Sequence, residues 1–258
     1  MPHDLENGMV EPLPGRPQPT DDTLVWRYMD FTKFVDLIST KRLFFSRADK
    51  LGDPFEGTYT ATHVPSESDL DGLKDGEKEQ LRSLRYFEIA AAKDNRKLFY
   101  INCWHANPGE SAGMWRLYSQ SNESVAVQTT FGKLKAAFPL APYKILAGPV
   151  NYLDYRTATI KELRGQVVFM SKRWSFEHEQ EVRLLFWSVD DAVFCNTKEN
   201  DEPPPGYPVE CELEELIQKA YVSPTSPDWF LGLVSRMCSQ FGVRAGVVRS
   251  DLASSPFS

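Results

Sequence analysis

Hydrophobic and polar positions alternate along some segments of the chain and recur every three to four residues along others. Alternation and dense runs of β-branched and aromatic residues predict strands, whereas the longer spacing predicts helices. The predicted strands are LVWRYM from Leu24, RLFFS (42–46), LFYINCWH (98–105), SVAVQTT (124–130), ILAGPVNY (145–152), the segment 174–187, KAYVSP (219–224) and VRAGVV (243–248). The predicted helices cover 31–38 after an Asp30 cap, most of 66–97, a short stretch after Ser111, 131–138, part of 155–171, and 230–241 before Gly242.

These elements show no internal repeat, and no convincing linker separates them. Strands and helices mixed in this way indicate an α+β protein. We therefore expect one α+β domain over residues 23–258, with a mixed or split β-sheet core and flanking helices. Residues 1–22 are rich in Pro, Gly and Asp and lack periodicity, which predicts a flexible arm that adds little to stability. The composition of 198–208 predicts an exposed loop.

The helix predicted within 66–97 belongs to an acidic stretch with a modest apolar stripe. Leu81, Leu84, Phe87 and Ala91 form that stripe. We expect this helix to pack on the outside of the domain.

The segment 174–187, WSFEHEQEVRLLFW, predicts a strand with two different faces. One face carries Gln180, Val182, Leu184 and Phe186 and is typical of a core. The other face carries Glu179, Glu181, Arg183, Leu185 and Trp187, which suits the floor of a cleft. A carboxylate there could hydrogen-bond a bound hydroxyl with little competition from water. The same pattern also fits a solvated face with cross-strand ion pairs, so both interpretations stay open.

Composition limits the classes of partner. The formal charge of −7 argues against a broad surface for nucleic acid or anionic membrane, although a local basic site around Lys172 and Arg173 remains possible. The chain has no apolar run near 18 residues and no secretory pattern at its start, so we expect a cytoplasmic protein without a membrane partner. In that compartment free thiols are expected at the four cysteines, Cys103, Cys195, Cys211 and Cys238.

Metal and nucleophile signatures are weak. Cys103 and His105 share one strand face, but no second pair stands at ligand spacing, and the histidines are scattered. We favour a buried cysteine beside a hydrogen-bonded histidine, and expect no metal site. The Gly-rich signatures GxGxxG and Walker A are absent.

A dispersed set of aromatic, basic and acidic residues could instead form a nucleotide site. Such a site needs an aromatic slot, a cation for a phosphate and a carboxylate for a ribose hydroxyl. The candidates are Arg27 and Tyr28 on the first strand, Asp53, Phe55 and Glu56 in a turn, Trp115 and Tyr118 on one helix face, and Glu179, Glu181 and Arg183 downstream. Each also has a structural interpretation, because Trp115 and Tyr118 are commonly core residues and GDPFEG is often only a tight turn held by its Asp.

The order of three motifs resembles a bacterial family of unknown function, catalogued as number 2971. The motifs are WRYMD with FVDLISTKRLFFSRADKLGDPFEG, then CWH with MWRLYSQSNESVAVQ, then KRWSFEHEQEVRLL. The resemblance covers most of the chain, from about Leu24 to Val248. The blocks are short, and they are specific in combination. The family label itself implies no chemistry.

A second resemblance, to the ADP-ribosyltransferase fold, does imply chemistry. The helix pattern FxxFxxLI followed by RLFFS is similar to the opening of that fold, SAGMWRLYS to the block that shapes the nicotinamide pocket, and EQEVRLLF to the strand with the catalytic Glu. The resemblance implies NAD as substrate, Arg27 on phosphate or ribose, Tyr118 stacked on nicotinamide, Glu181 as catalytic acid and Glu179 near the acceptor. The chain departs from the pattern, since it lacks a clear Ser-Thr-Ser block and has WRY instead of a His-bearing opening.

Three functional hypotheses follow. The first is an ADP-ribosyltransferase-like enzyme that cleaves the nicotinamide–ribose bond of NAD, with protein, nucleic acid or water as acceptor, in toxin or phage-defence biology. The second is a non-catalytic module of the same fold that binds a nucleotide or a protein. The third is a nuclease in which Asp53, Glu56, Glu179 and Glu181 converge on Mg²⁺. For the first, we expect Arg27, Trp115 or Tyr118, and Glu181 to line one concave site.

Overall fold

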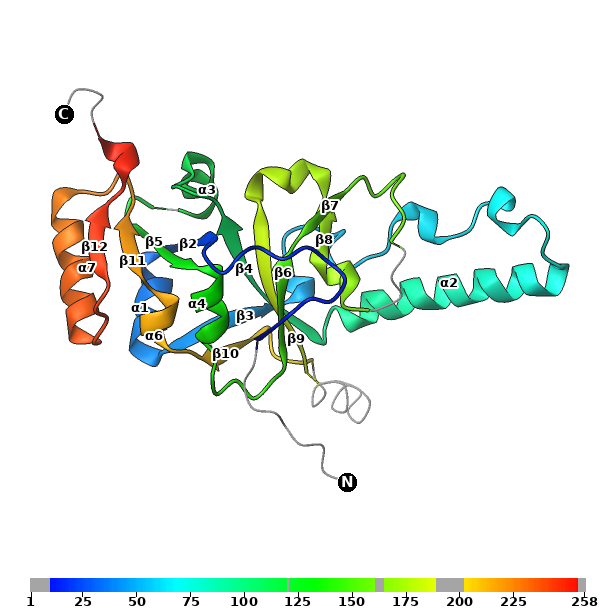
Figure 1. Ribbon diagram of the computed structural model, residues 1–258, viewed down its shortest axis with the longest axis horizontal. Helices are drawn as coiled ribbons and strands as arrows, with labels where there is room; N and C mark the ends of the chain where they lie inside the picture. Colours follow the sequence, from blue (N-terminus) through cyan, green and yellow to red (C-terminus); the bar gives the residue numbers. More distant parts are fainter. Residues whose placement is uncertain (1–9, 120, 161–164, 189–201, 255–258) are drawn as a thin grey trace.

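A ten-stranded mixed sheet forms the centre of the protein (Figure 1). A computed structural model describes residues 10–119, 121–160, 165–188 and 202–254. Along the main path the strands follow the order β1, β6, β9, β4, β2, β5, β11 and β12, while β3 pairs with both β4 and β10. The strands are β1 Val10–Pro12, β2 Leu24–Asp30, β3 Arg42–Arg47, β4 Phe99–Ala106, β5 Ser124–Thr130, β6 Ile145–Pro149, β9 Glu181–Trp187, β10 Gly206–Glu210, β11 Lys219–Val222 and β12 Gly246–Arg249. A separate parallel pair joins β7 Asn151–Leu153 to β8 Ser171–Arg173.

Helices cover one face of the sheet and bury the largest core cluster. They are α1 Phe31–Thr40, α4 Phe131–Ala136, α6 Leu213–Leu216 and α7 Asp228–Gln240. Their apolar side chains pack against the residues of β2, β5 and β9 that alternate toward this face, among them Val25, Val127 and Leu184. The predicted mixed sheet with flanking helices is therefore confirmed.

The opposite face is covered by short elements, and two smaller clusters lie there. Around β4 and β9, the 3₁₀ helix Val167–Met170 packs on Ile101 and Leu185. Farther along, α3 (Ala112–Tyr118) packs Met114 and Trp115 on β2 and β5. Between these clusters the face is left for the polar residues of the candidate site.

The sheet is split beside β4. Strand β2 pairs with β4 only at the C-terminal end of β4, where Trp26 lies opposite His105. Strand β3 pairs with β4 near the N-terminal end of β4, where Ser46 lies opposite Ile101. Among the described strands, none pairs with residues 102–104 on that edge, so β2 and β3 diverge around a gap.

A long helix leaves the body of the protein. Helix α2 (Asp75–Asn95) projects from the sheet, with its last turn at the body and its first turn at the free end (Figure 1). The helix predicted within 66–97 thus starts later than 66, because a 3₁₀ turn, Glu67–Leu70, precedes it. Two residues of the predicted apolar stripe, Leu84 and Phe87, are exposed rather than packed. None of the helices in the described part of the chain has the length and hydropathy needed to cross a membrane.

The predicted strand over 174–187 is wrong in its first half. Residues Trp174–Glu179 form a 3₁₀ helix, Gln180 takes the left-handed conformation (φ 38°), and β9 begins only at Glu181. Because the chain reverses there, Gln180 is exposed and not part of the core. From Glu181 onward the predicted alternation holds, with Val182, Leu184 and Phe186 in the main core.

The predicted flexible arm is wrong for residues 10–22. Strand β1 pairs in parallel with β6, Leu13 is buried at 4% exposure, and Glu11 forms an ion pair with Lys144 at 2.6 Å. Nη1 of Arg16 also donates to the carbonyl of Met170 at 2.9 Å. Composition does not reveal the pairing of β1 with β6, because backbone pairing in a strand does not depend on the Pro-rich residues beside it. Residues 1–9 lie outside the described residues.

Two smaller predictions also need correction, while the prediction of free thiols holds where the structure describes the cysteines. Where a helix was expected in 155–171, the described residues contain a 3₁₀ helix and no α-helix, and 161–164 lie outside them. The predicted loop 198–208 ends in β10, because Gly206 starts the strand that pairs with β3. Free thiols are confirmed at Cys103, Cys211 and Cys238, while Cys195 lies outside the described residues.

Candidate active site

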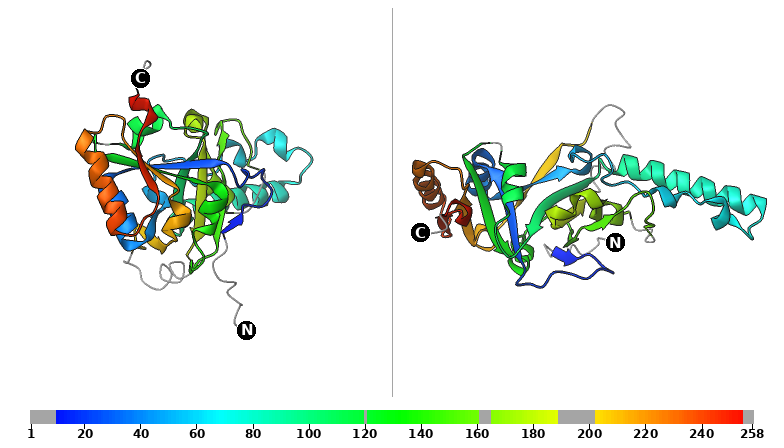
Figure 2. Two further views of the ribbon diagram at one scale, coloured as in Figure 1. Left: turned by 60° about the vertical axis from the view of Figure 1, so that its left-hand side comes forward. Right: turned by 90° about the horizontal axis from the view of Figure 1, so that it is seen from above.

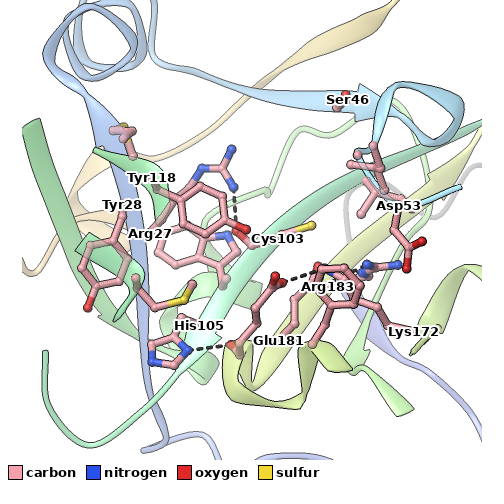
Figure 3. A pocket seen from close by; sticks show the side chains of 18 of the residues that line it. Arg27, Tyr28, Ser46, Asp53, Cys103, His105, Tyr118, Lys172, Glu181 and Arg183 are labelled. Atoms are coloured by element: carbon pink, nitrogen blue, oxygen red, sulfur yellow. Dashed lines mark hydrogen bonds and ion pairs between the residues drawn. The ribbon is translucent and has the colours of Figure 1, made fainter. Parts of the chain in front are cut away.

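A cavity of about 700 Å³ opens where the sheet is split (Figure 3). Eight of the residues predicted from the sequence line it: Arg27, Tyr28, Asp53, Glu56, Tyr118, Glu179, Glu181 and Arg183. They come from β2, a turn after β3, α3, the 3₁₀ helix 174–179 and β9. Phe55 and Trp115, which were also predicted, do not line it. The expected meeting of Arg27, Tyr118 and Glu181 at one concave site is thus found in the structure.

Arg27 fills the gap between β2 and β4. Its Nη1 donates to the carbonyl of Cys103 at 2.6 Å, which supplies the partner that a neighbouring strand would otherwise provide. Burial lowers the pKa of Arg27, and the negative field of Glu181 opposes that effect. Among the described residues, no carboxylate forms an ion pair with this guanidinium. Arg27 therefore combines a structural hydrogen bond with a positive charge that is not neutralised by direct contact.

Tyr118 is held at the rim of the cavity by a well-anchored helix. The hydroxyl of Ser111 accepts from the backbone N–H of Met114 and caps α3, as predicted. Tyr118 ends the helix with 42% of its surface exposed, and burial of the rest raises the pKa of its hydroxyl. Trp115 instead lies beneath, edge to face with Tyr28 at a centroid distance of 5.0 Å. The structural interpretation therefore holds for Trp115, and Tyr118 alone presents a free ring.

Glu181 is a buried carboxylate between two cations. It accepts from Nε of Arg183 at 2.7 Å and from Nζ of Lys172 at 3.3 Å. Its backbone N–H donates to the hydroxyl of Tyr152 at 2.7 Å, which fixes the start of β9. Burial alone would raise the pKa of Glu181, but Arg183 and Lys172 outweigh it and bring the pKa to about 2. Glu181 is ionised at neutral pH.

Lys172 is the member of the site that the sequence analysis did not place there. Its ammonium lies 2.7 Å from Glu179, 3.3 Å from Glu181 and 3.4 Å from Glu56. Burial would lower the pKa of Lys172, but the surrounding carboxylates hold it above its usual value. The motif KRWSFEHEQEVRLL begins with this lysine, yet only the 3₁₀ turn between Lys172 and Glu181 brings the two together.

Glu56 completes a buried network of three acids and two cations. It forms an ion pair with Nη2 of Arg183 at 2.6 Å, without the geometry of a hydrogen bond. Burial raises the pKa of Glu56 despite Arg183 nearby, and the negative charge of Glu181 adds to that effect. The network holds three carboxylates and two cations, and its Glu56 carboxylate is easier to protonate than an ordinary glutamate because its pKa is raised.

The turn that carries Asp53 is held as the sequence predicted. The side chain of Asp53 accepts from the backbone N–H of Phe55 at 3.1 Å and pairs with Arg173 at 2.9 Å. The guanidinium of Arg173 also lies 4.6 Å from the centre of the Phe55 ring. Phe55 thus packs against Arg173 beside the turn and does not line the cavity. Gly57, with φ +70°, closes the turn in a conformation that other residues rarely adopt.

A Mg²⁺ site at these carboxylates is not formed. Within the described parts of the chain, no three His, Cys, Asp or Glu side chains lie where they could hold a metal ion. Glu56, Glu179 and Glu181 do converge, but Lys172 occupies the point between them, and Asp53 is paired with Arg173. The predicted convergence on Mg²⁺ is wrong for this arrangement, because the ammonium of Lys172 already occupies the point between the carboxylates.

His105 is hydrogen-bonded as expected, whereas Cys103 is only half-buried, and both residues line the cavity. Burial raises the pKa of the Cys103 thiol, which disfavours its nucleophilic form. The ring of His105 bonds through Nδ1 to the carbonyl of Glu179 at 2.6 Å, and burial lowers its pKa, so the neutral ring is the donor. This bond ties β4 to the turn that carries Glu179.

Comparison with known proteins gives limited information. No family model matches the chain, so the resemblance to the family numbered 2971 stays a prediction, and no curated protein sequence matches either. Among solved structures, the chain is similar to Thermus sp. 2.9 DarT in complex with carba-NAD⁺, with 8% sequence identity and a TM-score of 0.36. That similarity covers 91% of this chain and 98% of the other. A TM-score this low assigns neither family nor function, so the geometry above must support any functional conclusion.

Proposed function

We propose that this protein is an ADP-ribosyltransferase-like enzyme that cleaves the bond between nicotinamide and ribose in NAD. One observation carries the proposal. Arg27, Tyr118 and Glu181, which lie far apart in the sequence, line a single cavity in the split of the sheet. Its volume of about 700 Å³ falls within the range of ligand pockets.

Glu181 is suited to the bond-breaking step. As the bond between the ribosyl carbon and nicotinamide lengthens, positive charge develops on the ribose, and a fixed carboxylate stabilises that charge. The low pKa of Glu181 ensures that the carboxylate is ionised when substrate binds. It would accept a hydrogen bond from the ribose 2′-hydroxyl. Nicotinamide would leave as the neutral base with the bonding electron pair.

Arg27 and Tyr118 would bind the rest of the substrate. A guanidinium without an ion-pair partner among the described residues is a good site for a phosphate oxygen. The half-exposed ring of Tyr118 offers a flat surface on which nicotinamide could stack. Both groups are held by the backbone of regular elements, which favours a preformed site.

Glu179 would act on the acceptor. It lies beside Glu181 across Lys172 and could take the proton of an attacking hydroxyl as the new bond to the ribosyl carbon forms. With water as acceptor the products would be ADP-ribose and nicotinamide. With a protein or nucleic acid the ADP-ribose would remain attached.

A non-catalytic nucleotide-binding module is the second candidate, and one observation favours it. The carboxylate of Glu181 is already bonded to Arg183 and Lys172, as in a purely structural ion network. In that case the cavity would bind a nucleotide without turning it over.

Nicotinamide release from NAD separates the two candidates. Purified wild type is incubated with NAD, with and without candidate acceptors, and nicotinamide and ADP-ribose are followed by chromatography. Glu181→Gln should lower turnover by roughly 100-fold or more. Glu177→Gln, a neighbouring exposed glutamate outside the cavity, is the matched control and should leave turnover unchanged.

Because Glu181 belongs to a buried network, its substitution also affects folding. Tyr118→Ala is therefore tested as well, since Tyr118 is half exposed and its loss should spare the fold. NAD binding is measured by calorimetry on each folded variant. Binding by wild type without nicotinamide release would favour the non-catalytic module, and absence of both would reject the NAD proposal.

A further inference from the structure

The gap between β2 and β3 continues into a second cavity. Its volume is about 510 Å³, and residues of β2, α1 and β3 line it. Helix α1 connects the two strands and packs beside both of them (Figure 1, Figure 2). The residues that line both this cavity and the candidate active site are Arg27, Met29, Lys33, Phe44 and Ser46. The two cavities therefore form one continuous cleft.

Arg27 lies at the junction of the two cavities. Together with Ser46, it lies at the end of the candidate active site that is farther from His105 (Figure 3). Beyond this end, the polar residues that line the second cavity are Thr32, Lys33 and Asp36 of α1 and Arg42 of β3. A ligand bound at Glu181 could thus extend past Arg27 into the second cavity.

Positive charge predominates in the second cavity. Arg27, Lys33 and Arg42 line it, and Asp36 is the one acidic residue among its described lining residues. Within the described part of the chain, the guanidinium of Arg42 has neither an ion pair nor a side-chain hydrogen bond. Two of the three cations, Lys33 and Arg42, lie beyond the junction at Arg27.

Neighbouring carboxylates neutralise these cations only weakly. The carboxylate of Asp30 is 3.7 Å from the ammonium of Lys33, whose side chain is 72% exposed, so solvent and salt screen the attraction. Glu210 lies opposite Arg42 on β10, but it forms no ion pair with Arg42 and does not line the cavity. In a chain with a formal charge of −7, a local excess of positive charge indicates a site for an anion.

Phe44 adds a flat apolar surface beside these cations. Along β3 it alternates with core residues, so Arg42, Phe44 and Ser46 share the face that points away from the main core. Its side chain is 48% exposed. An exposed aromatic ring on one strand face with a guanidinium suits a purine base that stacks on the ring and a phosphate beside it.

The orientation of a dinucleotide in the cleft rests on the proposed function. With nicotinamide on Tyr118 and its ribose at Glu181, the diphosphate would reach Arg27 at the junction. The adenosine would then enter the second cavity, where its base can stack on Phe44. Adenosine itself is neutral, so it would leave Lys33 and Arg42 without a charged group to bind.

We propose that the second cavity binds the adenosine 2′-phosphate of NADP, and that the cleft therefore prefers NADP to NAD. A phosphate monoester carries about −1.5 to −2 charges at neutral pH, which matches the two cations. The guanidinium of Arg42 can donate two parallel hydrogen bonds to such a group, and Lys33 supplies a second positive charge. The nicotinamide–ribose bond breaks as described above, and the 2′-phosphate stays on the adenosine.

Binding to the full chain is the first test. Calorimetry is carried out with NAD, with NADP and with adenosine 2′,5′-bisphosphate, which carries the same 2′-phosphate without nicotinamide. Wild type should bind NADP at least about 10-fold more tightly than NAD, because hydrogen bonds to a charged group contribute more than those between neutral groups. The ratio of kcat/KM for nicotinamide release from the two dinucleotides should favour NADP as well.

Substitution of the two cations tests the assignment. Lys33→Gln with Arg42→Gln should lower the affinity for NADP at least about 10-fold more than the affinity for NAD. Lys41→Gln is the matched control, because Lys41 is exposed and adjacent to Arg42 but lines neither cavity, and the preference for NADP should persist in it. All three side chains are exposed, so the variants should fold, which circular dichroism and thermal melting check.

The outcomes distinguish this inference from the proposed function. Equal affinity of wild type for NAD and NADP overturns the inference and leaves NAD cleavage standing. A preference for NADP that persists without Lys33 and Arg42 also overturns it, as does an equal loss of both dinucleotides, which would place the two cations on the diphosphate. Tighter binding of NADP without nicotinamide release supports the phosphate site and rejects the enzyme. Absence of binding by all three compounds rejects both.

Discussion

The hydroxyl of Tyr152, on β7, accepts the backbone N–H of Glu181, the first residue of β9, at 2.7 Å. The small β7–β8 pair therefore positions the central carboxylate of the site, although it does not belong to the main sheet. Lys172 comes from the same pair, so two of the contacts that hold Glu181 have one structural origin.

Tyr152→Phe should lower both stability and turnover. The substitution removes the acceptor and leaves the buried N–H of Glu181 without a partner, which costs about 1–3 kcal/mol. Urea denaturation measures the stability, and nicotinamide release measures the turnover. Tyr86→Phe, on the exposed side of α2, is the control and should change neither. Equal effects of the two substitutions would mean that the hydrogen bond between Tyr152 and the backbone of Glu181 does not contribute to the free energy of unfolding.

Stability should fall in acid through Glu181. The folded pKa of Glu181, about 2, is below its unfolded value of 4.5, so its contribution is fully present above pH 4.5 and is lost as pH falls toward 2. Glu56, whose folded pKa is raised, acts in the opposite direction, so the comparison needs a variant. The free energy of unfolding of wild type should decrease more steeply over this range than that of Glu181→Gln. If the free energies of unfolding of wild type and Glu181→Gln changed in parallel with pH, the ion pairs assigned to Glu181 would be contradicted.

Lys172→Met should destabilise the protein strongly at neutral pH. It leaves three buried carboxylates with Arg183 as their cation, and breaking a buried pair costs about 3–5 kcal/mol. Adding Glu56→Gln to Lys172→Met should recover part of the loss, because it restores the balance of charge. Denaturation of the two single variants and the double variant gives the coupling energy. Additive effects would show that Lys172 and Glu56 do not interact.

Residues 10–16 should contribute to stability, in contrast to the expectation of a flexible arm. Leu13→Ala should cost about 2–4 kcal/mol, as for other buried leucines. Leu140→Ala, at an exposed position, is the matched control and should cost little. Removal of residues 1–16 should lower the melting temperature by several degrees. An unchanged melting temperature would mean that β1 adds nothing to the sheet.

Local patterns predicted the strands of the central sheet because their signals lie within each segment. The runs at 42–46, 98–105 and 124–130 agree with β3, β4 and β5 within one or two residues. Strand β10 was missed because Gly206 and Pro208 are typical of loops. Its partner β3 is more than 150 residues away, and that pairing overrides the local preference.

Candidate site residues were predicted by type, while their grouping depended on topology. Arg27 and Glu181 could be named from their strands, but their approach results from the divergence of β2 and β4. Trp115 and Tyr118 have equivalent helical signals, and only packing against Tyr28 distinguishes the buried ring from the free one. Lys172 was named only as part of a possible local basic site and not with the carboxylates, because a lysine beside an arginine resembles an ordinary surface pair.

The pairing of β4 with β2 at one end and β3 at the other has a mechanical consequence. Backbone hydrogen bonds close the gap at both ends, so its width is fixed and its two sides cannot move apart as hinged lobes do. Widening it would require breaking ladder bonds at Trp26 or Ser46, so a ligand would have to fit the width already present. Amides at both ends of the gap should then exchange slowly with solvent, and their exchange should change little when a ligand enters.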